Sequence, residues 1–256
     1  MGGDARVPKL GIQNFGYMYL ANTEGSADQL RRNQIVQKNV GAATQLMSGE
    51  AVTRTYPFYN VDDIILGSIN RVDEGYWDGA KVFNWWRRQS RERDVTYIQN
   101  EIVEFNRNPA VDLINSVGLA SGELLGCGQV VKVSGPRAEK TAAMAGIDIP
   151  VEPRKRFLWI FLAAKPLDQE LPLTIDTSGV HEREIGGGTY QCGGHSDFDP
   201  AVDFDDFDMD FTLWENHVWP IIVNRIPQFD AVKVVHEWAG HYSMNTFDQN
   251  AIMGPY

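Results

Sequence analysis

Several features that mark common protein classes are missing from this sequence. No run of about 18 apolar residues occurs, so we expect no membrane-spanning helix. Residues 1–4 have neither a basic head nor an apolar run, unlike a secretion signal. The two cysteines, Cys127 and Cys192, form no C-x-x-C pair and are too few for a disulfide framework. Two buried thiols in a reducing cytoplasm are therefore expected.

Phosphate-binding and metal-binding patterns are also missing. No G-x-G-x-x-G follows a predicted strand, and no G-x-x-x-x-G-K-[ST] occurs, so the chain has no dinucleotide or P-loop fingerprint. The five histidines form no HExxH pair. An EF-hand loop starting at Asp197 would need glycine and glutamate where Val202 and Asp208 stand. We therefore expect no metal site.

Basic residues are scarce relative to acidic ones. With 23 Lys and Arg against 34 Asp and Glu, the net charge is −11, which disfavours nucleic acid as a partner. Residues 197–210 hold seven aspartates and no base, and two basic clusters lie at residues 87–93 and 154–156. We expect both basic clusters to be solvated surface, and the aspartates to precede a helix N-terminus.

The sequence is rich in short alternating and periodic segments. Asp78 is expected to cap a helix running to about Arg93, and Pro220 to kink or split a helix around residues 211–222. Gly146 is expected as a left-handed C-terminal cap, and residues 121–122 and 186–188 as turns. Further helices are predicted at residues 26–40 and 137–145, and strands at 15–20, 64–69, 95–98, 101–105, 115–119, 127–133, 156–163, 173–176, 179–184, 189–194 and 231–239.

Closely spaced strands from residue 156 onward indicate antiparallel pairing rather than alternating βαβ units. The expected fold class is therefore α+β, or mixed α/β, with a mainly antiparallel sheet flanked by helices. His195 and His241 follow glycines at predicted strand ends, where a ligand can approach the backbone closely. A pocket role and a purely structural role both remain open for these histidines.

Four segments together resemble the D-amino-acid oxidase (DAO) family of FAD-dependent oxidoreductases, which includes sarcosine oxidase and dimethylglycine dehydrogenase. These segments are residues 75–78 (GYWD), 130–138 (VVKVSGPRA), 146–151 (GIDIPV) and 238–255 (WAGHY through DQNAIMGP). The resemblance covers nearly the whole chain. It is strongest to the subgroup containing a mitochondrial oxidoreductase linked to complex I assembly.

The resemblance implies which parts of the family pattern this chain contains. It corresponds to an internal fragment, without the N-terminal G-x-G-x-x-G unit and the C-terminal glycine-rich stretch. The implied domains are a partial FAD-binding domain at residues 76–148 and the start of a C-terminal FAD-binding segment at 240–256. Residues 1–75 and 149–239 would form the substrate-binding domain.

The resemblance also implies site residues. Ser134, Gly135 and Pro136 match the segment along the ADP half of the flavin, where Lys132 replaces a family asparagine. Ile102 matches a position whose backbone faces adenine. Gly240 matches the cysteine that tethers the flavin in sarcosine oxidases, so non-covalent FAD is expected.

On the substrate side, His195 and Tyr242 match residues that face the substrate, and His241 is a further candidate. Gln191 stands where sarcosine oxidases carry an oxygen-activating lysine. A neutral amide does not favour superoxide as a cation does, so we expect dehydrogenase-like behaviour. Arg156 is considered as a partner for the substrate carboxylate.

The implied activity is oxidation of the C–N bond of a small amino acid or N-methyl amino acid, with hydride transfer to FAD. The alternative is a catalytically inactive fragment, or an assembly or binding module that keeps the fold. The expected location is the cytoplasm, or the mitochondrial matrix in a eukaryote. The substrate and the electron acceptor stay undefined.

Overall fold

The computed structural model describes residues 6–7, 9–108, 110, 113–196 and 198–255. Residues 1–4, which were assessed above as a possible signal, and Asp197 of the acidic segment lie outside this part. Two compact units divide the chain. The first unit comprises Met1–Gln89, Phe157–Phe198 and Met209–Ala239, and the second comprises Ser90–Arg156, Asp199–Asp208 and Gly240–Tyr256.

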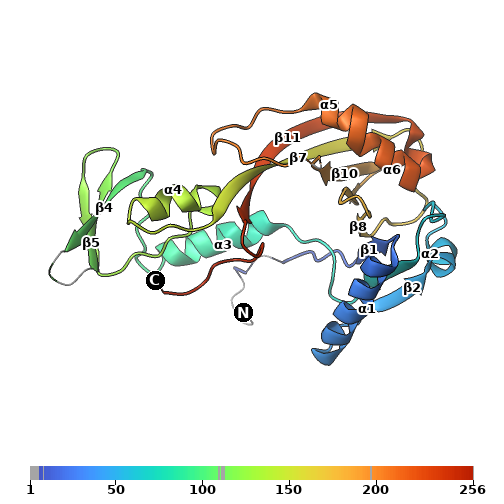
Figure 1. Ribbon diagram of the computed structural model, residues 1–256, viewed down its shortest axis with the longest axis horizontal. Coiled ribbons are helices and arrows are strands. Elements are labelled where there is room, and N and C mark those ends of the chain that lie inside the picture. Colours follow the sequence, from blue (N-terminus) through green and yellow to red (C-terminus); the bar gives the residue numbers. More distant parts are fainter. Residues whose placement is uncertain (1–5, 8, 109, 111–112, 197, 256) are drawn as a thin grey trace. The chain divides into compact units, whose positions relative to one another are not determined.

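An eight-stranded sheet organises the first unit, in the order β11-β7-β10-β9-β8-β1-β3-β2 (Figure 1). Strands β7 and β11 contribute residues to both units. The pairings β7–β10, β10–β9 and β9–β8 are antiparallel, which confirms the predicted run, and β8 lies parallel to β1. The strands are β1 (Tyr17–Ala21), β2 (Gln45–Ser48), β3 (Leu66–Asn70), β7 (Val151–Ala163), β8 (Leu173–Ile175), β9 (His181–Gly186), β10 (Thr189–Gly194) and β11 (Val232–Asn245).

Several helices begin after side-chain caps, of which the cap at Asp78 was predicted. Helix α1 begins after a capping box in which Thr23 and Ser26 bond each other's backbone N–H. Asp78 Oδ1 accepts from the Ala80 N–H at 3.0 Å, which confirms its capping role at α3. The helices of the first unit are α1 (Glu24–Asn39), α2 (Gly49–Thr55), α5 (Phe211–Leu213) and α6 (Trp219–Arg225). Helix α3 (Gly79–Arg91) begins in the first unit and ends in the second.

A π-helical turn, Trp214–Val218, joins α5 to α6 directly before Pro220. Proline cannot donate the backbone hydrogen bond that a regular helix requires, and its ring crowds the preceding turn. The helix predicted around this proline is therefore divided by a π turn, which is how the expected kink or split is realised.

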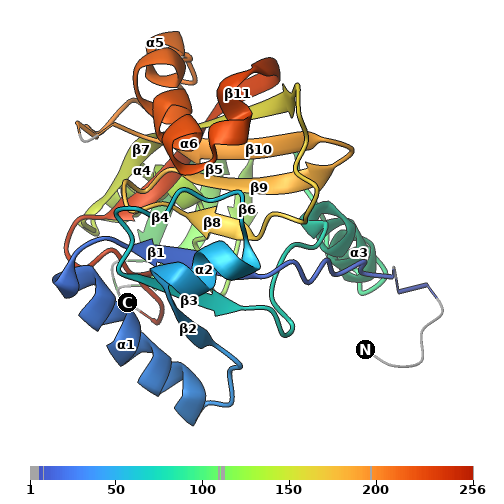
Figure 2. The same cartoon turned by 90° about the vertical axis from the view of Figure 1, so that its right-hand side faces the viewer.

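The two faces of the sheet in the first unit differ in character. One face is apolar and packs against helices: Met18, Trp159 and Cys192 are fully buried in a core with Val52 of α2 and Ile222 of α6. Figure 2 shows α2 and α6 on this side of the strands. Because side chains alternate along a strand, residues one position away lie on the opposite face.

We call that opposite surface the polar face, defined by Tyr17, Tyr19, His181, Arg183 and Gln191. Cross-strand register places these residues on one side, since Gln191 lies opposite Arg183 on the neighbouring strand. His181 lies opposite Ile175, which in turn lies opposite Tyr19. The rings of Tyr17 and Tyr19 stack with centroids 5.0 Å apart. These five residues share the side away from the helix-covered core with aliphatic residues such as Ile160 and Ile175.

The apolar face nevertheless contains buried charge. Arg225 is 2% exposed and donates from Nε to Asp176 Oδ2 at 2.8 Å and from Nη1 to Asp63 Oδ1 at 2.8 Å. Glu182 of β9 is 1% exposed, and its Oε1 has no hydrogen-bond partner among the described residues. Burial raises the pKa of Glu182 well above its ordinary value of 4.5, Asp176 raises it further, and Arg225 opposes the shift. Burial therefore favours the protonated form of Glu182.

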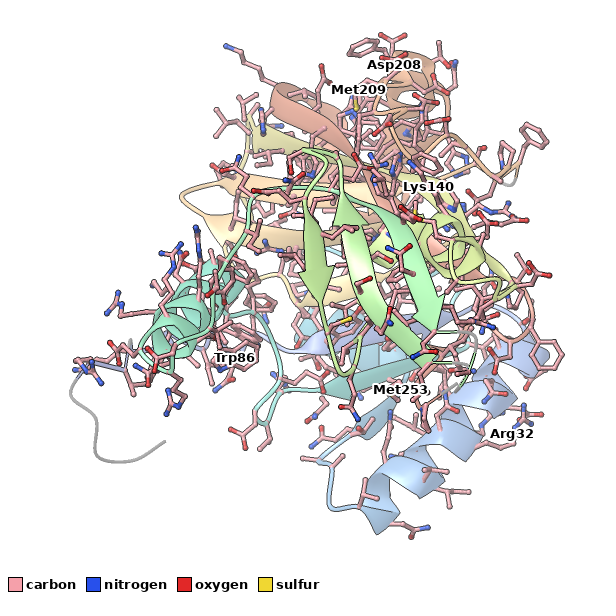
Figure 3. The ribbon with its side chains drawn as sticks, turned by 90° about the vertical axis from the view of Figure 1, so that its left-hand side faces the viewer. Arg32, Trp86, Lys140, Asp208, Met209 and Met253 are labelled. Atoms are coloured by element: carbon pink, nitrogen blue, oxygen red, sulfur yellow. The ribbon has the colours of Figure 1, made fainter. Side chains whose placement is uncertain are left out.

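The second unit contains a smaller sheet, in the order β4-β5-β6, whose strands lie side by side in Figure 3. Gly122, with φ of 90°, lies in the predicted turn between β5 and β6. Gly146 has φ of 73° after helix α4, which confirms the left-handed cap. The elements are β4 (Ile102–Asn108), β5 (Leu113–Leu119), β6 (Leu124–Gly126), a 3-10 turn (Gly135–Arg137) and α4 (Ala138–Ala143).

Two strand predictions in the second unit are wrong. Residues 95–98 and 127–133 have no strand structure, although both segments are rich in β-branched residues. A strand needs a hydrogen-bonding neighbour, and the sheet formed by the described residues of this unit contains only β4, β5 and β6. Val131 and Val133 are accordingly 83% and 88% exposed.

No helix among the described residues has the length and hydrophobicity needed to cross a membrane.

Glu182→Gln should change how stability depends on pH. The wild-type folded state holds the Glu182 proton more tightly than the unfolded state does, because burial raises the folded-state pKa. The contribution of Glu182 to stability is therefore complete below its unfolded-state pKa, and it is lost as the pH rises through its folded-state pKa. The wild-type free energy of unfolding should fall by up to about 1.4 kcal/mol per pH unit above pH ~5 relative to the variant.

Urea unfolding at a series of pH values measures this difference directly. Glu50→Gln is the matched control, because Glu50 lies exposed in the first turn of α2. Parallel pH profiles for wild type and Glu182→Gln would contradict the assignment.

Candidate active site

His195 directly follows β10, which ends at Gly194 as predicted. Its side chain is exposed, and its Nδ1 lies 2.8 Å from the Ser196 carbonyl oxygen. That contact occupies one ring nitrogen, which leaves Nε2 for a ligand. His195 belongs to the first unit.

Gln191 is held by a cation from the neighbouring strand. Arg183 Nη2 donates to Gln191 Oε1 at 2.8 Å, and the two residues are register partners on β9 and β10. The guanidinium carbon of Arg183 also lies 4.0 Å from the ring centroid of Tyr76. The neutral amide expected at position 191 thus has a positive charge beside it.

His181 occupies space that exists only because residue 193 is glycine. A Cβ atom on Gly193 would lie 2.6 Å from Cε1 and 2.7 Å from Nε2 of the His181 ring. Burial lowers the pKa of His181, Arg183 and His195 lower it further, and the backbone bond with Gly179 raises it. His181 is therefore a neutral imidazole at neutral pH, able to accept a hydrogen bond.

The strand expected to end near residue 239 continues to Asn245, so His241 and Tyr242 lie within β11 rather than after it. Both residues belong to the second unit. His241 Nε2 lies 2.7 Å from the Asp206 carbonyl oxygen, and its ring stacks on Phe207 at 4.3 Å. Tyr242 is 46% exposed, with the Arg156 guanidinium 5.3 Å from its ring centroid.

Arg156 already has a carboxylate partner within the protein. Its Nη1 and Nη2 donate to the two carboxylate oxygens of Asp199, each at 2.9 Å. This bidentate pair uses both Nη donors of Arg156, which a substrate carboxylate would also need. The structure therefore argues against Arg156 as the carboxylate-binding residue.

The acidic segment at residues 197–210 forms ion pairs with basic residues at 137, 155 and 156. Lys155 Nζ donates to Asp206 Oδ1 at 2.6 Å, and Arg137 pairs with Asp205. The expectation of a solvated surface is therefore wrong for residues 154–156, because ion pairing across the second unit takes precedence. Asp210 does precede a helix, since its Oδ1 accepts from the Thr212 N–H at 3.0 Å.

The residues expected to contact the cofactor lie in the second unit. Ser134 Oγ is buried, and no hydrogen-bond partner lies near it among the described residues. Gly135 follows with φ of 54° and opens the 3-10 turn that contains Pro136. Lys132 Nζ donates to the Ala138 carbonyl oxygen at 3.1 Å, so its charge turns back towards helix α4. Ile102 begins β4, and a Cβ atom on Gly240 would meet open space.

One open pocket of the first unit, about 440 Å³ in volume, is lined by residues that include Gln13, Phe15, Asp168, Glu170 and Glu184. None of the expected site residues lines it, and its three carboxylates would repel an anion. Among the described residues, no group of three or more His, Cys, Asp or Glu side chains could hold a metal ion.

Sequence reasoning missed His181 and Arg183 as members of this surface. The signal that could have found them is the tight turn at residues 186–188, where all three glycines have positive φ. Counting back from that turn along both strands pairs residue 183 with residue 191.

Residues 4–256 match the family described as FAD dependent oxidoreductase, DAO. This chain belongs to that family. It is 31% identical over 281 residues to the mouse protein named FAD-dependent oxidoreductase domain-containing protein 1, covering 99% of this chain and 58% of that protein. It is 23% identical to mouse mitochondrial sarcosine dehydrogenase, covering 95% of this chain and 27% of that protein.

Among solved structures, L-proline dehydrogenase from P. horikoshii has a similar fold. The TM-score is 0.81 at 22% identity, over 96% of this chain and 65% of that one. The expected fold class and family subgroup are therefore confirmed. The chain spans about half the length of the curated relatives that it matches.

Gly193→Ala should displace the His181 ring, because the added methyl group would overlap Cε1 and Nε2. We expect a loss of about 1–3 kcal/mol in stability, and a His181 pKa that moves back up towards 6.5 as the ring becomes hydrated. Histidine NMR titration and urea unfolding measure these two effects.

Gly25→Ala in α1 is the control, since a Cβ atom there meets nothing within 4 Å. Helix propensity predicts no loss of stability for this control. An unchanged His181 titration in Gly193→Ala would show that the ring does not occupy the space beside Gly193.

Proposed function

We propose that this chain forms the substrate-handling part of an FAD-dependent oxidoreductase that oxidises the C–N bond of a small amino acid or N-methyl amino acid. The observation that carries the proposal is the polar face of the first unit, within a chain that matches the family over residues 4–256. Arg183, Gln191 and a neutral His181 provide a cation, an amide and a hydrogen-bond acceptor on one sheet surface. Such a surface suits a small zwitterion or its neutral-amine form.

The names of relatives support this substrate class. L-proline dehydrogenase and sarcosine dehydrogenase are both named for amino acids whose nitrogen is secondary. The expectation of a small amino acid or N-methyl amino acid agrees with both names.

The residues of the second unit fit part of FAD. A buried hydroxyl without a partner, such as Ser134 Oγ, is costly unless a ligand completes its hydrogen bonding. Gly135 in the left-handed region has no Cβ atom to obstruct an approaching group. We propose that Ser134, Gly135, Pro136, Ile102 and Gly240 contact FAD without a covalent link.

FAD, when bound, supplies the hydride acceptor. The chain's own residues then bind and orient the substrate. We assign His195 and Tyr242 to direct substrate contact, and Gln191 to positioning through its bond with Arg183. Neutral His181 can accept a hydrogen bond from an N–H of the substrate amine, which orients the nitrogen and the adjacent C–H bond. His241 is bonded to Asp206 and stacked on Phe207, and we assign it to holding β11 beside the acidic segment.

FAD binding tests the cofactor assignment. The purified chain, titrated with FAD, should quench flavin fluorescence and acquire visible absorption bands that are released by acid precipitation. Ser134→Ala should weaken this binding about fivefold, the effect of losing one hydrogen bond of about 1 kcal/mol. Ser116→Ala is the control, because its Oγ lies in β5 and already donates to Asn115.

A folded chain that leaves flavin fluorescence unchanged would contradict the cofactor assignment. That result would favour the alternative of a binding or assembly module that keeps the fold without the chemistry. Flavin retained by acid-precipitated protein would contradict non-covalent attachment.

Electron-acceptor preference is a second test. Arg183 lies beside Gln191, but its guanidinium is engaged by the Gln191 amide oxygen, and no cation occupies position 191 itself. The flavin-loaded protein should therefore reduce an artificial dye much faster than oxygen. Gln191→Lys should raise the oxygen rate by at least about tenfold, because a cation stabilises superoxide. Gln191→Met, which removes the amide without adding charge, is the control. Equal rates with oxygen and dye in the unsubstituted protein would refute dehydrogenase-like behaviour.

A further inference from the structure

Arg183 is exceptional among the arginines of the described residues. Five of these arginines are not exposed: Arg137, Arg154, Arg156, Arg183 and Arg225. Four of the five form an ion pair with a carboxylate inside the protein. Arg183 forms none with a described residue. Its polar partners among the described residues are uncharged: the Gln191 amide oxygen at 2.8 Å, the Glu184 carbonyl oxygen at 3.5 Å and the Tyr76 hydroxyl.

An unpaired, half-buried cation is costly to maintain in a folded protein. Burial lowers the pKa of Arg183, while Tyr76 raises it, so the guanidinium is partly desolvated without a counter-charge. The chain has 34 acidic residues, so the absence of a carboxylate partner here is not due to scarcity. An anion supplied from outside the protein would remove this cost.

The surroundings of Arg183 hold it in one orientation. One Nη donates to Gln191, and the guanidinium lies 4.0 Å from the centroid of the Tyr76 ring. Both contacts are neutral, so they position the group without cancelling its charge. The nearby ionisable side chains of His181 and His195 carry no negative charge. The geometry is that of an anion site.

We propose that Arg183 is the residue that binds the carboxylate of the substrate. This inference rests on the proposed function for the substrate class, but the binding step itself needs only the first unit. A planar guanidinium binds a carboxylate through parallel charge-assisted hydrogen bonds. Carboxylate binding by Arg183 would make the site selective for amino acids and N-alkyl amino acids over simple amines.

Carboxylate selectivity can be measured without flavin. N,N-dimethylglycine and trimethylamine carry the same amine with and without a carboxylate. Calorimetric titration of the full chain should give tighter binding of N,N-dimethylglycine. Arg183→Met should weaken that binding roughly ten- to hundredfold and leave trimethylamine unchanged. The affinity of Arg183→Lys for N,N-dimethylglycine should lie between those of wild type and Arg183→Met, because lysine keeps the charge but loses the bidentate guanidinium.

Arg32→Met is the matched control. Arg32 lies on α1 (Figure 3), and its Nη2 donates to Gln29 Oε1 at 2.8 Å, the same kind of contact that Arg183 makes with Gln191. Arg32 differs in being exposed, so its loss should leave both affinities unchanged. Circular dichroism of each variant verifies the fold.

Phenylglyoxal labelling gives a second readout in the unsubstituted chain. Peptide mass spectrometry should show that N,N-dimethylglycine protects Arg183 from the reagent and that trimethylamine does not. Equal affinity of wild type and Arg183→Met for N,N-dimethylglycine would overturn the proposal, as would the absence of carboxylate preference in the wild type. Protection of Arg183 in a chain that binds no FAD would reject the cofactor assignment alone, and FAD binding without protection would reject Arg183 alone.

Discussion

The pairing of β9 with β10 is the constraint on which the candidate site depends. One register places Glu182 opposite Cys192 on the apolar face and Arg183 opposite Gln191 on the polar face. A slip of one residue would exchange the two faces and put a guanidinium into the helix-covered core. This register is set by the tight turn between the strands, with three glycines of positive φ, and by the irregularity beside it, where the register shifts between Thr189 and Tyr190. The β9–β10 hairpin therefore buries one side of the sheet against the helices and exposes Arg183 on the other side.

Charge is distributed differently in the two units. In the second unit, the basic residues at 137 and 154–156 pair with aspartates of the acidic segment or with Glu152. In the first unit, Arg225 holds two carboxylates in the core, while Arg183 has none. Arg183 is thus left without a counter-charge among the described residues, which is the basis of the carboxylate site proposed above. A site of this kind can be recognised by comparing each buried charge with its equivalents in the same chain.

Local patterns in the sequence were sufficient to predict the positions of many helices and strands. The strand β10 was predicted with its observed bounds, and the Asp78 cap and the Gly146 cap depend only on neighbouring residues. Pairing between distant segments was not predictable in this way. Residues 127–133 have strand composition but no strand neighbour, and the acidic segment reaches Arg137 across 68 positions of sequence. The glycine turn could place Arg183 opposite Gln191, but only the folded structure shows that Arg183 has no carboxylate partner among the described residues.

The π turn in Trp214–Val218 has a geometric consequence for the helix that covers the core. A regular helix advances about 100° per residue, so the extra residue of a π turn rotates everything after it by that amount relative to what precedes it. Leu213 before the turn and Ile222 after it both reach the core. Without the π turn, an uninterrupted α-helix would place Leu213 and Ile222 about 180° apart, so that only one of these two apolar groups could face the core. The distortion thus corrects the phase of the helix, so that both of its ends remain in contact with the sheet.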